Sequence, residues 1–304
     1  MRHGLAPAAV ALAGVIGLAW SAASQPAQVV SIEVAVTTST GSMVAGLTAS
    51  DFEVLVDGKP VPIHALAAPP VPLTLVALFD CTASMSTYRD LDAEIERSLA
   101  PSLRETDRAR IGGIASRLAL SPRFTSVRKE LIEGGRKALD FPRAEMYGPS
   151  PIWDAVIEAV RALESEPGRR GLLLVTDGRA TGNTVAGADA IRSAIAAGVV
   201  VQVLSEARTN YYRQDTDSVA RVRTGLRLEE LTRQTGGMIL PEDDKPTAQL
   251  PTAGPAIARL VNDLREMYTI GIAQAGPAGS AHRVAVKVKR EGLSVRARSG
   301  YRSR

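Results

Sequence analysis

The stretch LTLVALFDCTAS, residues 73–84, indicates both the fold class and a site. Residues 73–79 form a largely apolar run, which is typical of a strand that is buried on both faces of a parallel sheet. The run ends on Asp80, and hydroxyl side chains follow at Thr82 and Ser84. A carboxylate with two alternate hydroxyls just beyond a buried strand predicts a binding loop at this place.

The pattern of residues 73–79 recurs further along the chain. Apolar runs at 171–175 and 199–204 alternate with segments of helical periodicity. Buried strands that alternate with helices predict a doubly wound α/β domain, with a mostly parallel sheet flanked by helices. We expect the helices over residues 91–102, 127–139, 151–164, 185–197, 228–235 and 255–265.

The two ends of the chain have a different, β-type pattern. Residues 29–37 are rich in β-branched side chains and have the alternating pattern of a strand. The strands expected over 52–56 and 60–63 flank Asp57-Gly58, which predicts a hairpin with a primed turn. The proline-rich segment AAPPVP (67–72) marks a boundary. Three more strands are expected over 268–272, 282–289 and 293–297, and they need a partner sheet. We therefore expect segments 25–70 and 267–304 to pair into one small β domain beside an α/β domain at 71–266.

Residues 1–24 are typical of a secretory signal peptide. Arg2 and His3 precede an apolar stretch over 8–20, and small residues follow it. The apolar stretch is shorter than the ~20 residues that span a bilayer, so cleavage near Ser24 is favoured over retention as an anchor. We expect an exported protein, periplasmic or extracellular, without a membrane span after cleavage. Cys81 is the only cysteine, so the chain forms no internal disulfide.

The charge of the chain argues against a nucleic-acid partner. The formal net charge is +4, and basic residues are interspersed with acidic ones along most of the sequence, as on a solvated surface. One basic cluster stands out near the C-terminus. Electrostatic binding there is the less favoured interpretation, because export removes the usual nucleic-acid partners. Its members are Arg283, Lys287, Lys289, Arg290, Arg296, Arg298, Arg302 and Arg304.

Five oxygen-bearing side chains form a candidate metal site. Asp80 and Asp177 each follow a buried strand, and the carboxyl ends of parallel strands meet at the ligand-binding rim. Two close carboxylates are costly unless something neutralises them. Thr82 and Ser84 add hydroxyl oxygens, and Ser150 adds another from a loop before a helix. Hard oxygen ligands without a Cys/His set suit Mg²⁺.

Three segments resemble the von Willebrand factor type A (VWFA) domain. DCTAS (80–84), GPSPIWDA (148–155) and LLLVTDG (172–178) are similar to its D-x-S-x-S, G-x-T-x-L-x-D-A and T-D-G segments. Segments 46–63, 228–243 and 268–301 resemble the exported bacterial VWFA-related family of acidobacterial type. The family's first serine is Thr82 here, and its loop threonine is Ser150.

The resemblance implies a Rossmann-like fold with a metal-ion-dependent adhesion site (MIDAS). Mg²⁺, with Mn²⁺ or Ca²⁺ as alternatives, would be held by the five side chains directly or through water. One coordination position would be left for an acidic side chain of a protein partner. The implied ligands are Asp80, Thr82, Ser84, Ser150 and Asp177.

Several of these residues also have simpler interpretations. Ser150 followed by Pro151 fits a helix start, with serine as the N-cap and proline as the first helical residue. Asp177 before a glycine is by itself only a turn signal. Asp154 is expected to serve the positive end of its helix and local hydrogen bonds.

Other reactive or binding roles are less favoured. Cys81 is expected to be a small packed residue, because a nucleophile needs an activating base and the histidines are scattered. The polar stretch around Tyr211 and Tyr212 is a weaker candidate for a binding loop. Trp153 is expected to be a packing residue of the core.

The sequence thus favours an exported, non-enzymatic protein-binding module that depends on a metal ion. An alternative is a structural or assembly component of the cell envelope or a secretion system, which uses the β domain and the basic cluster without metal. A hydrolase that uses metal-bound water is disfavoured, because no positioned base stands out beyond the ligands.

Overall fold

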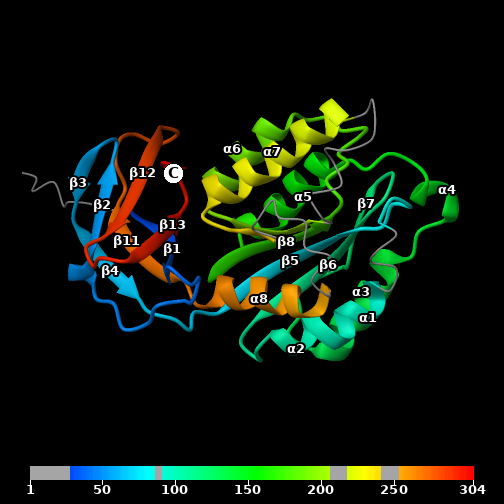
Figure 1. Cartoon of the computed structure of the whole chain (residues 1–304), viewed down its shortest axis with the longest axis horizontal. Coiled ribbons are helices and arrows are strands. Elements are labelled where there is room, and N and C mark those ends of the chain that lie inside the picture. The colour runs from blue at the N-terminus through cyan, green and yellow to red at the C-terminus, as the bar shows by residue number, and fades with distance from the viewer. Residues whose placement is uncertain (1–27, 86–90, 206–217, 241–252) are drawn as a thin grey trace, which may run out of the picture.

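Two domains lie side by side in the computed structural model, a larger α/β domain and a smaller β domain (Figure 1). The model describes residues 28–85, 91–205, 218–240 and 253–304. The expected signal peptide and the stretch around Tyr211 and Tyr212 lie outside these ranges. Among the described helices, none combines the length and the apolar character that crossing a membrane requires.

The α/β domain is built on a six-stranded sheet in the order β10-β9-β8-β5-β6-β7. Neighbouring strands are parallel except at the β6–β7 edge, where the pairing is antiparallel. This topology confirms the doubly wound, mostly parallel sheet. The strands are β5 (Leu73–Asp80), β6 (Arg108–Ile114), β7 (Leu118–Leu120), β8 (Arg169–Thr176), β9 (Val200–Ser205) and β10 (Ile239–Leu240).

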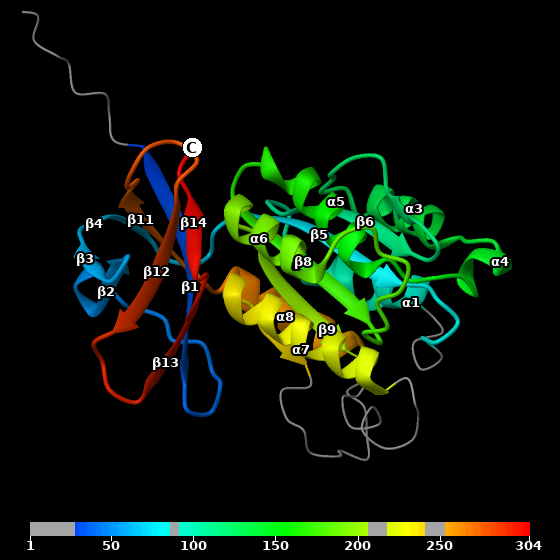
Figure 2. The same cartoon turned by 90° about the horizontal axis from the view of Figure 1, so that it is seen from above.

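Helices cover both faces of this sheet (Figures 1 and 2). One face carries α1 (Leu91–Glu94), its π-helical continuation (Ile95–Leu99), α2 (Ala100–Ser102), α3 (Arg128–Leu139) and α8 (Ala253–Arg265). The other face carries α5 (Ile152–Glu164), α6 (Gly187–Ala197) and α7 (Ser218–Thr235), and the short α4 (Arg143–Met146) lies in a connection. All six predicted helices are present, although α7 begins ten residues earlier than expected.

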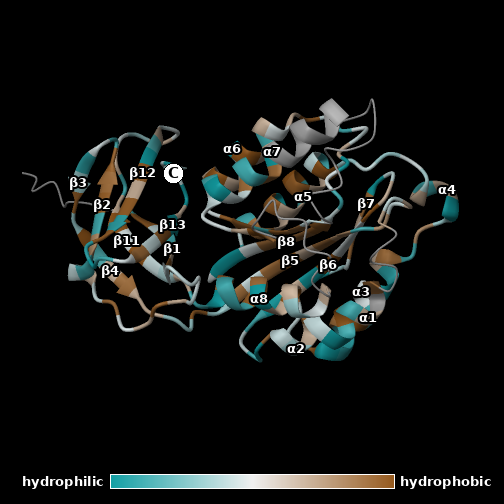
Figure 3. Cartoon of the chain, in the orientation of Figure 1, coloured by the Kyte–Doolittle hydropathy of each residue, from teal (hydrophilic) through white to brown (hydrophobic). Residues whose placement is uncertain are grey.

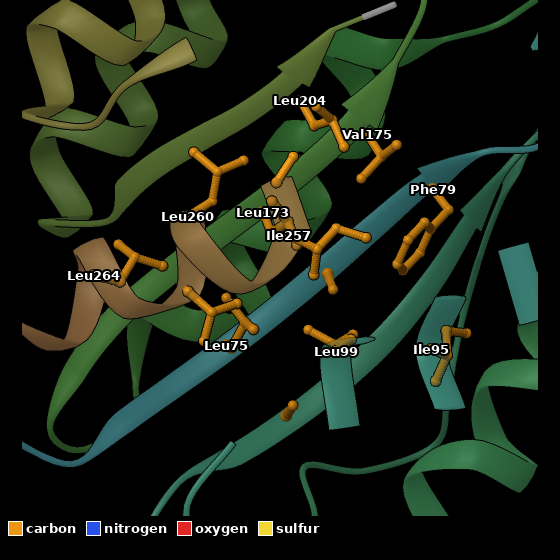
Figure 4. Close-up of a cluster of buried hydrophobic side chains, with 14 of the residues drawn as sticks. Leu75, Phe79, Ile95, Leu99, Leu173, Val175, Leu204, Ile257, Leu260 and Leu264 are labelled. Carbon is orange, nitrogen blue, oxygen red and sulfur yellow. The ribbon is translucent and has the colours of Figure 1, made fainter. Parts of the chain in front are cut away.

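The core explains why the apolar run of β5 has no polar side. Leu75 and Phe79 pack against the α8 face (Figure 4), whereas Val76 and Leu78 pack against the α5 face. Successive side chains point to opposite faces, so a strand with helices on both sides must be apolar at every position. Figure 3 shows this as hydrophobic central strands between helices whose outer surfaces are more hydrophilic.

Strand β6 was not predicted, and its glycines explain why. Gly112 and Gly113 lie near the end of its sequence, RARIGGI, where glycine weakens a strand pattern. A Cβ atom on Gly113 would collide with the carbonyl oxygen of Ala138 and lie 2.6 Å from the Phe141 ring. The end of α3 therefore packs directly on the backbone of this strand.

Gly113→Ala is expected to lower the free energy of unfolding by about 1–3 kcal/mol, because the added methyl group overpacks this contact. Urea unfolding followed by circular dichroism measures the loss. An unchanged stability would contradict the close approach. Ala119→Ser, on the partly buried edge strand β7, serves as a control with little expected effect.

The β domain contains both ends of the described chain. Its antiparallel sheets have the orders β13-β1-β11-β4 and β14-β12-β2-β3. Strand β1 lies between β11 and β13, so the two ends pair as the sequence predicted. Asp57 and Gly58 both have positive φ, as a primed turn requires. The elements are β1 (Val29–Thr38), the 3₁₀ turn Ala49–Asp51, β2 (Phe52–Val56), β3 (Lys59–Val61), β4 (Ile63–Ala67), β11 (Tyr268–Ala273), β12 (Ala281–Val288), β13 (Leu293–Ala297) and β14 (Gly300–Arg302).

A buried arginine joins the two domains. Arg169, the first residue of β8, donates to main-chain carbonyls between residues 264 and 267, at the end of α8. Its guanidinium also donates to Glu33 Oε2 on β1 at 3.1 Å and to Thr269 Oγ1 on β11 at 3.0 Å. One side chain thereby connects the central sheet, the last helix and the β domain.

Candidate metal centre

The candidate site lies where the winding of the sheet reverses. Strands β5 and β8 are neighbours, but the chain leaves β5 toward β6 on one side and leaves β8 toward β9 on the other. Such a reversal opens a crevice beyond the carboxyl ends of the two strands. Asp80 is the last residue of β5, and Asp177 directly follows β8. The topology therefore brings both aspartates to this crevice.

Three predicted hydroxyl residues gather around the Asp80 carboxylate. Asp80 Oδ1 accepts hydrogen bonds from Thr82 Oγ1 at 2.6 Å and from the Thr82 amide at 3.0 Å. Its Oδ2 accepts from Ser150 Oγ at 3.2 Å. The hydroxyl of Ser84 is hydrogen-bonded to that of Thr82 at 3.1 Å. Four of the five predicted residues thus form one hydrogen-bonded cluster.

Asp177 lies close enough to this cluster for its charge to raise the pKa of Asp80. Its side chain is buried, and its Oδ1 accepts a hydrogen bond from the Arg179 amide at 2.9 Å. Its Oδ2 is buried without a hydrogen-bond partner, although Arg179 Nε lies 3.3 Å away. Within the described residues, no hydrogen bond joins Asp177 to the other four. It belongs to the site through its charge and its place on the rim.

The electrostatics of Asp80 favour a cation in this crevice. Burial raises the pKa of its carboxyl group, hydrogen bonds from Thr82 oppose that rise, and the negative charge of Asp177 adds to it. A buried carboxylate beside a second one is unfavourable unless a positive charge compensates both. The ligand atoms available are hard oxygens, and Asp177 Oδ2 accepts no hydrogen bond, although the exposed Arg179 forms an ion pair with it. This donor set fits Mg²⁺ or Mn²⁺.

Thr176 is a site residue that the sequence analysis missed. Its hydroxyl donates to Asp80 Oδ2 at 2.9 Å and accepts from the Gly178 amide at 3.0 Å. It therefore orients the carboxylate of β5 from the end of β8. The available signals were its place directly before Asp177 and its match to the threonine of the T-D-G segment.

The capping interpretation of Ser150 was wrong. Helix α5 begins at Ile152 and Pro151 precedes it, and the first-turn amide of Trp153 donates to Asn183 Oδ1 at 2.7 Å, not to Ser150. The Ser150 hydroxyl donates to Asp80, while the Ser150 amide donates to Thr181 Oγ1 at 2.9 Å. The hydroxyl points toward the buried Asp80 carboxyl group and not toward the amides of the first helical turn.

Asp154 has a supporting role away from the ligands. It accepts hydrogen bonds from the amide of Thr184 at 2.9 Å and from the amide of Val185 at 3.0 Å. These contacts tie the first turn of α5 to the loop that follows Asp177. The expectation of local hydrogen bonds is confirmed, with the partners in that loop.

The packing roles expected for two nearby side chains are also confirmed. Cys81 is buried against Ala115 and Phe141, and its thiol donates to the Phe79 carbonyl at 3.4 Å. Trp153 is buried in the core on the α5 face. Among the described residues, no three His, Cys, Asp or Glu side chains come together as a potential metal-binding group.

Comparisons with known proteins found distant structural likenesses. No family model matches the chain, and no curated protein matches it. Similar solved structures include an aerotolerance-related membrane protein from Bacteroides fragilis, with 17% identity, TM-score 0.44, and coverage of 62% of this chain and 98% of that one. Another is a von Willebrand factor type A protein from Catenulispora acidiphila, with 14% identity, TM-score 0.39, and coverage of 83% and 74%.

A third is the manganese-loaded TRAP protein from Plasmodium vivax, with 13% identity, TM-score 0.42, and coverage of 83% of this chain and 100% of that one. None of the three likenesses is close enough to bear on function.

Proposed function

We propose that this chain is an exported, non-enzymatic protein-binding module whose binding depends on a divalent cation. Asp80, Thr82, Ser84, Ser150 and Asp177 would hold Mg²⁺, directly or through water, and an acidic side chain of the partner would complete its coordination. The observation that carries the proposal is the buried Asp80 carboxylate, ringed by hydroxyls and near a second buried carboxylate with an oxygen that accepts no hydrogen bond.

The chemistry of the cluster supports an adhesion role over catalysis. Three of its five side chains are neutral hydroxyls, so a bound cation would keep a strong attraction for an external carboxylate. A hydrolase would also need a base near the metal. The two histidines within the described ranges, His64 and His282, both lie in the β domain, which packs at the opposite end of the sheet (Figure 1). Export remains part of the proposal on the strength of residues 1–24.

Calorimetric titration with Mg²⁺ and Mn²⁺ is the direct test of the metal site. The protein without residues 1–24 should bind one ion saturably. Ser150→Ala should weaken binding by about tenfold or more, because it removes one oxygen of the donor set. Ser150→Thr is the matched control: it keeps the hydroxyl and introduces the residue of the VWFA motif, so affinity should be retained.

The outcome is decisive in either direction. Absence of saturable binding to either ion would overturn the proposal. Equal affinities for Ser150→Ala and Ser150→Thr would remove Ser150 from the ligand set. If the protein associates with partners equally well in chelator, the metal-independent assembly role becomes the better account.

The acidic-partner part needs its own experiment. A peptide-display selection on the protein in Mg²⁺, with counter-selection in EDTA, should enrich sequences that contain Asp or Glu. Replacing that residue by Asn or Gln in an enriched peptide should remove binding. Enrichment without acidic residues, or binding that survives EDTA, would contradict a cation completed by a carboxylate.

A further inference from the structure

A pocket lies at the junction of the two domains, away from the metal centre. Its volume is about 370 Å³, and four arginines contribute to its lining: Arg170, Arg298, Arg302 and Arg304. Arg170 comes from β8, and the other three come from the last segment of the β domain. The end of α6 and the start of β1 complete the wall. Figure 2 shows these elements meeting where β14 approaches α6.

Six of the eight residues of the basic cluster near the C-terminus fall into two parts, and Arg283 and Lys289 belong to neither. One part is neutralised by ion pairs with carboxylates: Lys287 with Glu53, Arg290 with Asp51, and Arg296 with Asp263. The other part lines the pocket. Within the described ranges, no ion pair joins a carboxylate to any of the four pocket arginines. The pocket therefore concentrates positive charge that no direct ion pair neutralises, although Glu33 and Glu164 attract it from nearby.

Two of these arginines are held by groups that carry no net charge. Arg298 is 7% exposed, and its guanidinium donates to the Ile195 carbonyl at 3.3 Å and to the Ser31 carbonyl. Arg170 donates to the Glu164 carbonyl at 3.0 Å. The Nε atoms of both arginines are buried without a hydrogen-bond partner. Each guanidinium is thus positioned by the backbone but retains a donor and its charge.

The electrostatics show that these charges repel one another. Burial lowers the pKa of Arg298 to about 10, and the charges of Arg170 and Arg304 contribute to the decrease. The nearby Glu33 opposes it, but its carboxylate already accepts hydrogen bonds from Arg169 and from Thr269. An anion in the pocket would relieve this repulsion.

We propose that this pocket binds a small phosphate-type oxyanion. Guanidinium groups match phosphate oxygens in geometry and charge, and pre-positioned ones lose little conformational freedom on binding. A volume near 370 Å³ is at the small end of ligand pockets, which suits a free phosphate compound of a few heavy atoms. The pocket and Asp177 lie at opposite ends of β8, roughly 20 Å apart at about 3.3 Å per residue. The oxyanion site is therefore separate from the metal centre.

Calorimetric titration with sodium pyrophosphate tests the oxyanion site. The protein is kept in EDTA at about 0.15 M salt, where diffuse attraction between exposed charges is largely screened. One saturable site is expected. The double variant Arg302→Gln/Arg304→Gln should weaken binding at least about tenfold, because it removes two charge-assisted contacts at the exposed rim.

The matched control is Arg283→Gln. Arg283 is exposed on β12, belongs to the same basic cluster and lies outside the pocket lining, so its removal should change affinity less than about twofold. Equal weakening by both variants would reduce the binding to general surface charge and overturn the proposal. So would the absence of saturation up to about 10 mM pyrophosphate.

A lipid headgroup is the other source of the same chemistry. Co-sedimentation with phosphatidylcholine vesicles, with and without phosphatidylglycerol, separates the two sources. Binding to the anionic vesicles without binding of pyrophosphate would overturn the assignment to a free oxyanion. Asp80→Ala should leave pyrophosphate binding unchanged, so the two sites can fail independently.

Discussion

Asp80→Asn is expected to abolish Mg²⁺ binding and yet to make the metal-free protein more stable. The substitution removes a buried negative charge that lies near a second one, that of Asp177. Asparagine still accepts hydrogen bonds from Thr82 through its oxygen, and its amide group can donate to the hydroxyl of Ser150 or Thr176. In EDTA we expect a gain of about 1 kcal/mol in the free energy of unfolding, as for other functional residues that strain a fold.

Thermal unfolding in EDTA and in Mg²⁺ measures both effects. Wild-type protein should gain stability on addition of Mg²⁺, and the gain should rise with the logarithm of the Mg²⁺ concentration once that concentration exceeds the dissociation constant. Asp80→Asn should gain no stability from Mg²⁺. Its affinity for Mg²⁺ should fall at least about 100-fold. A loss of stability in EDTA would show that the carboxylate is structural.

Asp107→Asn is the control for burial alone. Asp107 is equally buried, but it pairs with Arg265 at 2.9 Å and accepts hydrogen bonds from the amides of Leu73 and Arg104. Removing its charge leaves a buried guanidinium unpaired, so this variant should be destabilised in EDTA and in Mg²⁺ alike. The two buried aspartates should therefore respond with opposite signs in EDTA.

Arg169→Met is expected to produce the largest loss of stability, about 3–5 kcal/mol. The substitution leaves Glu33 as a buried, unpaired carboxylate and removes the donors of three main-chain carbonyls at the end of α8. Arg169→Lys should recover little of the lost stability, because one ammonium group cannot donate to all the acceptors that the planar guanidinium contacts.

Chemical denaturation of the full chain measures this loss. The double variant Arg169→Met/Glu33→Gln should be less destabilised than the sum of its single variants, because it no longer buries an unpaired charge. Arg161→Met removes only an exposed pair with Glu158 on α5 and should change stability by less than about 0.5 kcal/mol. Additive single effects would contradict the coupling between Arg169 and Glu33.

Local patterns in the sequence were sufficient for most of the architecture. The apolar run of β5 identified a strand covered on both faces, and Asp57-Gly58 identified the primed hairpin. The convergence of Asp80 and Asp177 also followed, because parallel strands bring their carboxyl ends to one rim wherever they lie in the chain. The metal-binding role of the predicted cluster stays a prediction.

Other features depended on contacts between distant segments and were decided by the tertiary structure. Strand β6 was not predicted, because Gly113 is required by the close approach of α3 and has no apolar side chain that would contribute to a strand pattern. The roles of Thr176 and Ser150 arose from the direction in which each hydroxyl points, which residue spacing does not encode.

The junction between the domains is the clearest case of a feature that depends on contacts between distant segments. Arg169 and Arg170 look alike in sequence, but one is fully bonded between the domains and the other lines a pocket with Arg298. The sequence by itself determined which segments form strands and helices and which rim carries the carboxylates, because these follow from periodicity and handedness. The tertiary structure alone decided which charges are paired and which remain available, because pairing requires that residues distant in the sequence, such as Arg290 and Asp51, meet.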